Sequence, residues 1–501
     1  MKKLLQQSAA LSLPVSFWSA FARMIRPAPA ARRRLRRWRP GLDILEDRTL
    51  LSAYVAADVS SLIADINAAN KAGGTNTITL TAPATSPYIL TGVNNTADGG
   101  NGLPQIVKKD NLTLVGNGDT IARSAAAGTP TFRLFDIANG ASLTLENVTL
   151  QNGIAQGSGT AADGGAIYNL GTLTLIGAAV QNNTALGASG ANGLVTSGTS
   201  TKVPTSINGQ AGGDAAGGAI WSSGSVTLEG GTVVQNNEAL GGEGGAAGAD
   251  FTRTNGNFAG SGGAGGGGLG GGIYEAGGSL NILNASLVGD TGAGGNGGGG
   301  FQMTGSSSSW NSAQSGFGGR GMGGGLYVAG GTLNATNVIV QANQALGGTG
   351  GATNDGAISG RHEAPGNGGV AFGGGIDLAG GTANLAGSQV LSNKANGGDG
   401  GSIPASFINS RDPGEGGNAY CGGFYVGAGT LTLTGDTVTG NEAIGGGPIS
   451  IPGQGVAGGI GIAPAAIVSL DSFTANNTIN NYVLNPNSEA ISNIVGNYTL
   501  L

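Results

Sequence analysis

Cysteine, histidine and charged residues are scarce in this sequence of 501 residues. It contains one histidine, His362, and one cysteine, Cys421, while charged residues make up 10% and aromatic residues 5% of the chain. A single cysteine excludes a disulfide within the chain. Without a cysteine–histidine cluster there is no conventional zinc site. No glycine run is followed by Lys-Ser or Lys-Thr, which excludes a phosphate-binding loop of the usual kind.

The few charges are unevenly distributed along the chain. The formal net charge is −6, but residues 1–50 hold 11 basic and 3 acidic residues, so the remainder has 11 basic and 25 acidic residues and a net charge of −14. An acidic body repels the phosphates of nucleic acids, so we expect no nucleic-acid partner. Low charge together with 39% apolar residues also argues against a disordered chain.

The N-terminal region predicts export from the cell. Its apolar run "SAALSLPVSFWSAF" is too short for a spanning helix, and the basic run "RRRLRRWRP" follows it, whereas a secretory signal has the basic residues first. The segment "LDILEDRTLLSA", Leu42 to Ala53, resembles the LE-x-R-x-LLS sorting segment of large exported planctomycete proteins, with Asp47 where that family often has proline. The resemblance implies a secreted or cell-surface protein. A basic arm that binds anionic surfaces by charge alone is the alternative.

Glycine is abundant, with 103 residues, and it accompanies an internal repeat. A Gly-Gly-x-apolar motif such as "GGAI" recurs with gaps of 53, 53, 53, 50, 48 and 36 residues between its apolar positions, which are Ile167, Ile220, Ile273, Leu326, Ile376, Phe424 and Ile460. Each motif is followed by alternating apolar and polar residues, as in Leu173 and Leu175, the pattern of a half-buried strand. One such unit cannot bury its own apolar face, so the repeats must stack as a solenoid.

A polar residue follows each motif after 16 or 17 positions, and asparagine predominates there. We predict a buried ladder of hydrogen-bonded side chains at a bend of each coil, because asparagine tolerates turns and its amide can bond to its copies in adjacent coils. The predicted ladder residues are Asn183, Asn237, Asn343, Asn393, Asn441 and Asn476, with Asp290 in the same series.

The paired GGA[ILV] and F-x-x-N signals resemble the repeats of chlamydial polymorphic outer membrane proteins and of related bacterial pectin-lyase-like proteins. The likeness covers about residues 160–480, with Val or Leu in place of Phe in most copies. It implies an all-β, single-stranded right-handed parallel β-helix solenoid with a surface-exposed, adhesive role. Only about two dozen residues follow Asn477, so we expect neither a membrane β-barrel nor a transmembrane span in the mature chain.

These signals predict four regions. Residues 1–53 form the export leader, 54–76 a capping helix, 77–482 the β-helix with its insertions, and 483–501 a C-terminal cap. In the helix, Val59, Leu62, Ile63 and Ile66 form one apolar stripe, and Gly73 ends it. The five glycine-rich insertions lie near 187–215, 241–270, 293–322, 346–372 and 396–421. We expect them to leave the coils at one point, to fan out on one side and to vary freely in length.

The candidate site residues all belong to the insertions. Basic and aromatic residues there predict a sugar-binding strip, with Lys202, Arg253, Trp310 and Arg320 as ligand-binding candidates. The only dense polar groups, "RHE" and "RDPGE", supply Arg361, His362, Glu363, Arg411, Asp412 and Glu415 as catalytic candidates for a lyase or glycoside hydrolase. Ordinary loop residues are the alternative in both cases. No cofactor is evident; a Ca²⁺ ion is an option that no motif supports.

The sequence thus favours an exported β-helix protein with a structural, adhesive or carbohydrate-binding role. Polysaccharide or cell-envelope components are the expected partners. The second hypothesis is a polysaccharide-active enzyme of the pectin-lyase-like fold, which needs carboxylates held rigidly together. 

Overall fold

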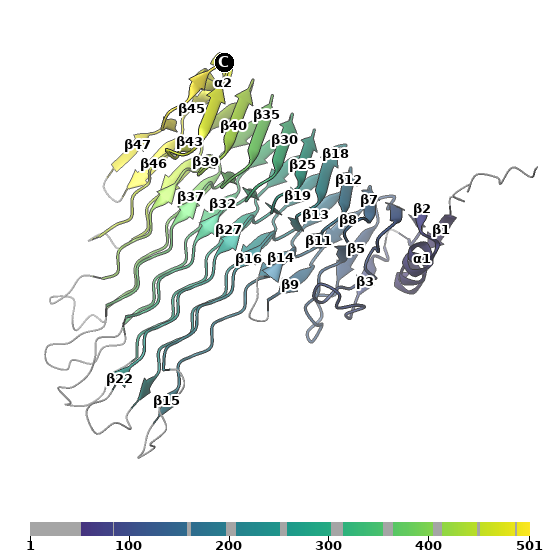
Figure 1. Cartoon of the computed structure of the whole chain (residues 1–501), viewed down its shortest axis with the longest axis horizontal. Coiled ribbons are helices and arrows are strands. Elements are labelled where there is room, and N and C mark those ends of the chain that lie inside the picture. Colours follow the sequence, from purple (N-terminus) through teal and green to yellow (C-terminus); the bar gives the residue numbers. More distant parts are fainter. Residues whose placement is uncertain are drawn as a thin grey trace, which may run out of the picture. The chain divides into compact units, whose positions relative to one another are not determined.

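The computed structural model describes residues 52–83, 85–157, 162–196, 207–250, 258–301, 314–353, 364–403, 413–447, 451–485 and 488–501 (Figure 1). All of them belong to the second of two compact units, residues 49–501; the first unit, residues 1–48, lies outside the described residues. The catalytic candidates Arg361, His362, Glu363, Arg411 and Asp412 and the ligand candidates Lys202, Arg253 and Trp310 lie outside them as well.

The described chain is a right-handed parallel β-helix, as predicted, in which five strand positions recur from coil to coil. Sheet 1 has twelve strands, namely β1 (Ser52–Ala56), β2 (Gly74–Leu80), β4 (Asp110–Val115), β7 (Ser142–Glu146), β12 (Thr172–Ile176), β18 (Ser225–Glu229), β25 (Ser279–Leu283), β30 (Thr332–Thr336), β35 (Thr382–Ala386), β40 (Thr430–Thr434), β44 (Ile467–Leu470) and β49 (Thr499–Leu500). Sheet 2 has ten, namely β3 (Tyr88–Leu90), β5 (Thr120–Arg123), β8 (Thr149–Gln151), β13 (Ala179–Gln181), β19 (Val233–Gln235), β26 (Ser286–Val288), β31 (Ile339–Gln341), β36 (Gln389–Leu391), β41 (Thr437–Thr439) and β45 (Thr478–Ile479).

Sheets 3, 4 and 5 complete each coil in the described residues. Sheet 3 holds β9 (Ile154–Gln156), β14 (Thr184–Leu186), β20 (Glu238–Leu240), β27 (Thr291–Ala293), β32 (Gln344–Leu346), β37 (Lys394–Asn396), β42 (Glu442–Ile444), β46 (Tyr482–Asn485) and β47 (Ser488–Ile491). Sheet 4 holds β10 (Ala162–Asp163), β16 (Ala215–Ala216), β23 (Gly268–Leu269), β28 (Gly321–Met322), β33 (Ala371–Phe372) and β38 (Ala419–Tyr420). Sheet 5 holds β6 (Phe135–Ile137), β11 (Ile167–Asn169), β17 (Ile220–Ser222), β24 (Ile273–Glu275), β29 (Leu326–Val328), β34 (Ile376–Leu378), β39 (Phe424–Val426), β43 (Ile460–Ile462) and β48 (Ile494–Val495). A coil therefore has more strands than the two or three that the alternation indicated.

The short N-terminal helix is present as α1 (Val59–Ala72). Asp58 is its N-cap: its Oδ1 accepts a hydrogen bond from the Ser61 N–H at 2.8 Å, and the Ser61 hydroxyl accepts one from the Asp58 N–H at 3.0 Å. Gly73 ends the helix, and Leu62 and Ile66 are fully buried against the first coils. The helix therefore shields the apolar interior of the coils with which it packs.

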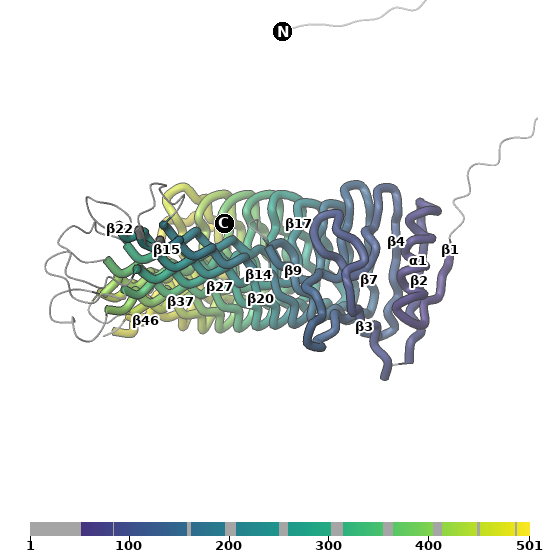
Figure 2. Tube along the Cα trace, turned by 90° about the horizontal axis from the view of Figure 1, so that it is seen from below, coloured from purple at the N-terminus to yellow at the C-terminus, as the bar shows by residue number. Residues whose placement is uncertain are grey.

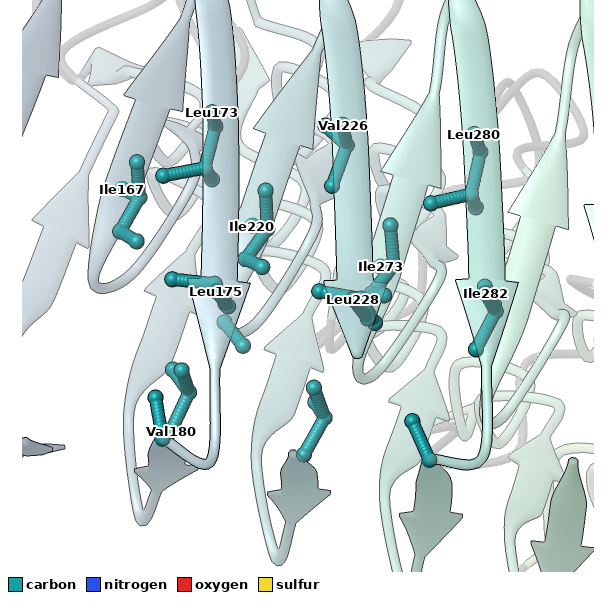
Figure 3. Packing of buried hydrophobic residues seen from close by; sticks show 14 of the residues in the cluster. Ile167, Leu173, Leu175, Val180, Ile220, Val226, Leu228, Ile273, Leu280 and Ile282 are labelled. Atoms are coloured by element: carbon teal, nitrogen blue, oxygen red, sulfur yellow. The ribbon is translucent and has the colours of Figure 1, made fainter. Parts of the chain in front are cut away.

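The apolar residues of the GGA[ILV] motif pair with one another in register. Ile167 lies beside Ile220, and the row continues through Ile273, Leu326, Ile376, Phe424 and Ile460 in neighbouring strands of sheet 5. Leu173 and Leu175 pair in the same way with Val226 and Leu228 in sheet 1. These side chains fill the bore of the β-helix (Figure 3), and each buried one stabilises it by about 1.5–3 kcal/mol relative to an exposed one.

The turn before each apolar residue of the GGA[ILV] motif, from Ile167 to Phe424, contains one residue with a left-handed backbone. Gly164, three positions before Ile167, has φ of 66°, and the corresponding glycines of the next four coils are also positive. In the sixth coil Cys421 takes this position with φ of 69°. Its thiol is buried, which raises its pKa well above the ordinary value. Cys421 is thus a small residue in a strained turn that glycine elsewhere adopts without cost.

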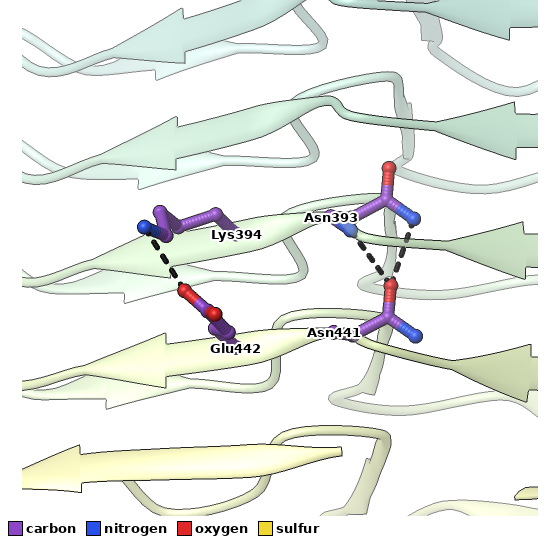
Figure 4. Close-up of polar contacts among 4 residues, drawn as sticks. All are labelled: Asn393, Lys394, Asn441 and Glu442. Atoms are coloured by element: carbon purple, nitrogen blue, oxygen red, sulfur yellow. Dashed lines mark hydrogen bonds and ion pairs between the residues drawn. The ribbon is translucent and has the colours of Figure 1, made fainter. Parts of the chain in front are cut away.

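The polar residues of the predicted ladder form a buried row at the bend between sheets 2 and 3. Where the preceding coil has asparagine in the row, the Oδ1 accepts two bonds from it: that of Asn441, for example, accepts the Asn393 N–H and side-chain amide, both at 2.9 Å (Figure 4). Beside this buried row, the half-exposed Lys394–Glu442 pair joins the same coils with an Nζ–Oε2 distance of 2.9 Å. The row runs from Asn183 through Asn237, Asp290, Asn343 and Asn393 to Asn441.

Asn476 does not belong to this row. It lies in α2 (Ser472–Asn477), and the next residue of the row is Asn481, whose Oδ1 accepts the Asn441 side-chain amide at 2.9 Å. The helix takes the place of the short turn between sheets 1 and 2 and adds residues before the row resumes. The left-handed backbone was expected at the ladder residues themselves. It is adopted instead by the residue before each ladder position, as in Asn182 with φ of 54°.

Asp290 is the one carboxyl group in this asparagine row. Its Oδ1 accepts the Asn237 N–H at 2.8 Å, whereas its Oδ2 has no partner. Burial raises the pKa of Asp290 to about 8. A protonated Oδ2–H stands where the other ladder residues have an amide N–H, so the neutral acid imitates asparagine.

This raised pKa predicts a loss of stability as the pH rises. The unfolded carboxyl titrates near about 4, so between about pH 4 and pH 8 the folded state keeps a proton that the unfolded state releases, and the free energy of unfolding falls. We expect Asp290→Asn to leave the thermal midpoint unchanged near pH 4 and to raise it at pH 8. Thermal unfolding of both proteins across this range measures the difference; a variant that matches the wild type at pH 8 contradicts the argument.

The glycine-rich insertions form paired extended arms wherever the structure describes them. From β14 to β37, an outgoing arm follows the sheet 3 strand and a returning arm precedes the next sheet 4 strand, and the arms of successive coils stack on one side of the β-helix (Figure 1 and Figure 2). Three consecutive N–H groups point in three directions: Gly244 donates to Asn296 of the next coil, Gly245 to Gln210 of a returning arm, and Ala246 to the exposed Asn192 side chain, at 2.8–2.9 Å. Three donor directions in three consecutive residues indicate an extended chain with three residues per turn, as in a polyproline II helix.

Glycine is required in the arms because the chains touch backbone to backbone. A Cβ on Gly263 would lie 1.9 Å from the Gln210 carbonyl oxygen, and one on Gly266 would lie 2.0 Å from that of Gly213. The arms thus pack as collagen chains do, where only glycine fits the crowded positions. The insertions leave on one side, as predicted, but their stems are stacked, hydrogen-bonded chains and not loops of free length.

The last residues add strands at the C-terminal end of the β-helix. β46 and β47 form an antiparallel pair, while β48 and β49 extend sheets 5 and 1 in parallel. Ile491 and Leu500 remain 63% and 58% exposed. The described 483–501 segment therefore continues the coil pattern without a layer covering these two side chains, and the domain boundaries at 53, 76 and 482 stay predictions.

Candidate functional site

Two site candidates from the sequence lie within the described residues, both on returning arms. Glu415 bonds to its neighbour Asn367, whose side-chain amide donates to the Glu415 Oε2 at 3.2 Å. Arg320 is exposed two coils earlier, directly before β28. The structure does not bring them together, and Arg320 instead lies in a pocket with three residues that no sequence motif indicated, namely Asp214, Leu269 and Met322.

Arg320 and Asp214 line a pocket of about 330 Å³ where the returning arms meet the β-helix. Leu269 and Met322 of sheet 4 provide its apolar part, and five short residues of the arms complete it, namely Ala264, Gly265, Gly267, Gly318 and Gly319. The volume lies at the lower end of the range for small-ligand sites, enough for about one sugar ring. A pocket that combines apolar surface, two charges and bare backbone suits a polar, ring-shaped ligand.

Gly267 explains why the pocket exists at this coil. Asp214, Gly267 and Arg320 occupy the same position in three successive returning arms, one coil apart. Because Gly267 has no side chain, a hollow remains between a carboxylate and a guanidinium group. No ion pair joins Asp214 and Arg320 in the described residues: Asp214 Oδ1 accepts the Gly267 N–H at 2.6 Å.

A row of stacked aromatic rings runs beside this pocket on sheet 5. Tyr168, Trp221, Tyr274 and Tyr327 each follow the GGA[ILV]-motif residue, and their ring centroids are 4.6, 6.3 and 5.1 Å apart with interplanar angles of 18° or less. We call these four residues the aromatic row. Stacked rings cover one another's faces, so the row presents ring edges and hydroxyl groups to solvent. The stacking holds neighbouring strands of sheet 5 together, and the row does not offer the open ring faces of a sugar-stacking strip.

The aromatic row and the pocket are electrostatically connected. Burial raises the pKa of Tyr274, and the carboxylates of Asp163 and Asp214 raise it further. Burial and Asp377 raise the pKa of Tyr327 above its ordinary range, whereas Arg320 lowers it. The phenol groups of Tyr274 and Tyr327 therefore stay protonated at neutral pH.

Ionisable side chains lie at both ends of the aromatic row. At one end the Arg133 guanidinium lies 5.0 Å from the Tyr168 ring, and Arg133 Nη1 donates to the Asp98 carbonyl oxygen at 2.6 Å. At the other end Asp377 replaces the ring, is 2% exposed, and has an unpartnered Oδ1. Burial raises its pKa to about 8. Beside it a second aromatic group forms, in which Phe372 stacks on Tyr420 at 4.8 Å.

Asp136 takes the position of the aromatic row in the coil before Tyr168. Asp136 Oδ2 accepts hydrogen bonds from Gln105 at 3.0 Å and Asn101 at 3.2 Å, and burial raises its pKa to about 6. Asp136 is fully buried, so a polysaccharide cannot reach it. Within the described residues, no three His, Cys, Asp or Glu side chains gather closely enough to hold a metal ion.

The aromatic row was detectable in the sequence, because each ring residue directly follows a motif residue at spacings of 53. The pocket was not, since it depends on which arm residues become neighbours. Among the described residues, no helix has the length and apolar character needed to cross a membrane. Comparisons with protein-family models, curated proteins and solved structures found no match.

Proposed function

We propose that this protein is an exported, cell-surface or extracellular β-helix that binds polysaccharide at the pocket between Asp214 and Arg320. The observation that carries the proposal is this pocket, which sets two unpaired opposite charges beside apolar side chains and exposed backbone. Sugars combine apolar C–H faces with hydroxyl groups, and charged side chains bind hydroxyls through charge-assisted hydrogen bonds. The β-helix holds the pocket rigidly, as a binding site requires.

Phe317 supports a carbohydrate ligand. It follows the pocket residue Ala264 by one coil on the same face of the returning arms and is 46% exposed. Its neighbour Ala264 is too small to cover a ring, so Phe317 offers the open aromatic face that the aromatic row lacks. Such faces pack against the apolar side of sugars. A chain bound across the pocket would thus lie along the stacked arms.

The test is a binding panel of neutral and acidic polysaccharides with the full chain, with cleavage recorded in the same samples. We expect binding to at least one polymer, and a loss of about tenfold in the double variant Leu269→Ala, Met322→Ala, which removes about 3 kcal/mol or less of apolar contact. Lys394→Ala, on the exposed face of sheet 3, is the matched control and should bind normally. Binding that the double variant retains in full would place the ligand elsewhere.

A further inference from the structure

The arms contain a repeated position at which a side-chain oxygen accepts an N–H from the next coil, and this oxygen is missing at two residues of the pocket. In the returning arms, N–H groups at three-residue intervals point to the outer face, and several of them donate a hydrogen bond to a side-chain oxygen one coil earlier. Asn208 serves Ser261 at 2.9 Å, Asp214 serves Gly267 at 2.6 Å, and Asn418 serves Gln454 at 2.8 Å. The outgoing arms repeat this, since the Asp399 carboxylate accepts the Gly447 N–H at 2.7 Å.

The position before Arg320 lacks this oxygen. The acceptor side chain would belong to residue 267, which is glycine, and within the described chain the Arg320 N–H has no hydrogen-bond partner. The same is true of the Ala264 N–H, because the residue one coil earlier is Ala211. Both residues line the 330 Å³ pocket. An exposed N–H and a guanidinium group on one residue attract an anion.

We infer that the pocket binds a carboxylate group of the ligand at the Arg320 N–H and guanidinium. This inference rests on the proposed polysaccharide function and adds the chemical class of the bound residue. The protein's own carboxylates show the geometry, because Asp214 and Asp399 occupy equivalent positions one coil before their N–H donors. The ligand carboxylate replaces the side chain that Gly267 lacks.

Asp214 makes the inference specific, because it opposes the ligand that Arg320 attracts. The Asp214 carboxylate lies one coil from the position that we assign to the ligand carboxylate, a spacing of about 4.8 Å along the stack. It therefore repels that carboxylate. Asp214→Asn keeps an oxygen for the Gly267 N–H, as Asn208 does for Ser261, and removes the charge. We therefore expect this variant to bind a carboxylate ligand about fivefold more tightly at low salt.

Gly267→Asn tests whether the ligand carboxylate occupies the place of the side chain that Gly267 lacks. A Cβ on Gly267 would lie 3.3 Å from Asp214 Oδ1 and 3.6 Å from the Arg320 carbonyl oxygen, and its backbone is not left-handed, so the arm accommodates it. The new amide oxygen would occupy the Arg320 N–H, as the other arm asparagines do. We expect carboxylate binding to fall about tenfold, and Arg320→Gln to reduce it similarly. Lys394→Ala in β37, a residue that does not line the pocket, is the control and should retain the binding.

The probes are dextran and carboxymethyl dextran, which differ only in carboxylate groups, measured with the full chain at low and moderate salt. Dextran sulfate separates a carboxylate site from general attraction of polyanions, and glucuronate against acetate separates a sugar acid from a simple carboxylate. Tighter binding of the carboxymethyl polymer, lost in Gly267→Asn and strengthened in Asp214→Asn, supports the inference. Equal binding of both dextrans, or weaker binding in Asp214→Asn, overturns it while leaving the proposed function in place. Failure of every polysaccharide in the panel removes the proposed function itself.

Discussion

Gly266→Ala should unfold the stacked arms around it, whereas Gly267→Ala, one residue further along, should leave them intact. The Cβ of residue 266 would lie 2.0 Å from the Gly213 carbonyl oxygen and 2.5 Å from its carbon, both backbone atoms that cannot move aside. At residue 267 the nearest atom is a side-chain oxygen at 3.3 Å. We expect Gly266→Ala to lower the free energy of unfolding by about 1–3 kcal/mol, the usual cost of overpacking.

Hydrogen exchange locates this effect. The Gly266 N–H donates to the Gly242 carbonyl at 2.8 Å and the Gly295 N–H donates to Gly266, so both amides should lose protection in Gly266→Ala. Amides of sheet 1, such as those of β25, should keep theirs, because the clash lies in the arms. Equal exchange in the two variants would show that the arms are not packed backbone to backbone.

Asn343→Ala should be among the most destabilising substitutions in the β-helix, and Asn334→Ala in the same coil should be nearly neutral. Asn343 is fully buried: its Oδ1 accepts the Asp290 N–H at 2.9 Å, and its amide donates to Asn393 Oδ1 at 2.9 Å and to the Leu287 carbonyl at 3.1 Å. Alanine leaves the buried Asp290 N–H without an acceptor. We expect a loss of about 3 kcal/mol, since each unsatisfied buried group costs about 1–3 kcal/mol.

Asn334 makes the same kind of side-chain hydrogen bond at a solvent-exposed position. Its amide donates to Asn281 Oδ1 at 3.1 Å and its Oδ1 accepts from Asn384 at 3.1 Å, on the exposed face of sheet 1. Water replaces these partners, so the expected loss is within about 0.5 kcal/mol. Chemical denaturation of the two variants measures the difference. Equal losses would mean that the pairing of amides, and not their burial, stabilises the ladder.

The period of the apolar residues was sufficient to predict the coils. Ile167 and Leu173 alternate with polar residues and recur at fixed spacing, and only in-register stacking buries all copies together. The ladder followed for the same reason up to Asn441. It failed at Asn476 because α2 inserts residues before the bend, and counting positions cannot detect a change in the path of the chain.

The pocket could be predicted from the sequence to a much smaller extent than the coils. Arg320 was selected for its charge and lies in the pocket, but its neighbour Asp214 was not, because 106 positions separate them in the sequence. Glycine composition suggested free loops, since glycine by itself allows many conformations. The arms gain their order from neighbouring arms, through bonds such as Gly245 N–H to Gln210, and such partners are set by stacking.

The sequence by itself determined the β-helix, its bore and most of its asparagine ladder, because repeated residues at a conserved spacing satisfy one another only when stacked. Tertiary structure alone decided that the glycine-rich stems pack as polyproline II arms, that the rings of the aromatic row lie face to face, and that a missing side chain at Gly267 opens a pocket between Asp214 and Arg320. The physical reason is that these features depend on atoms from different coils meeting at contact distance, which register and backbone path decide and composition does not.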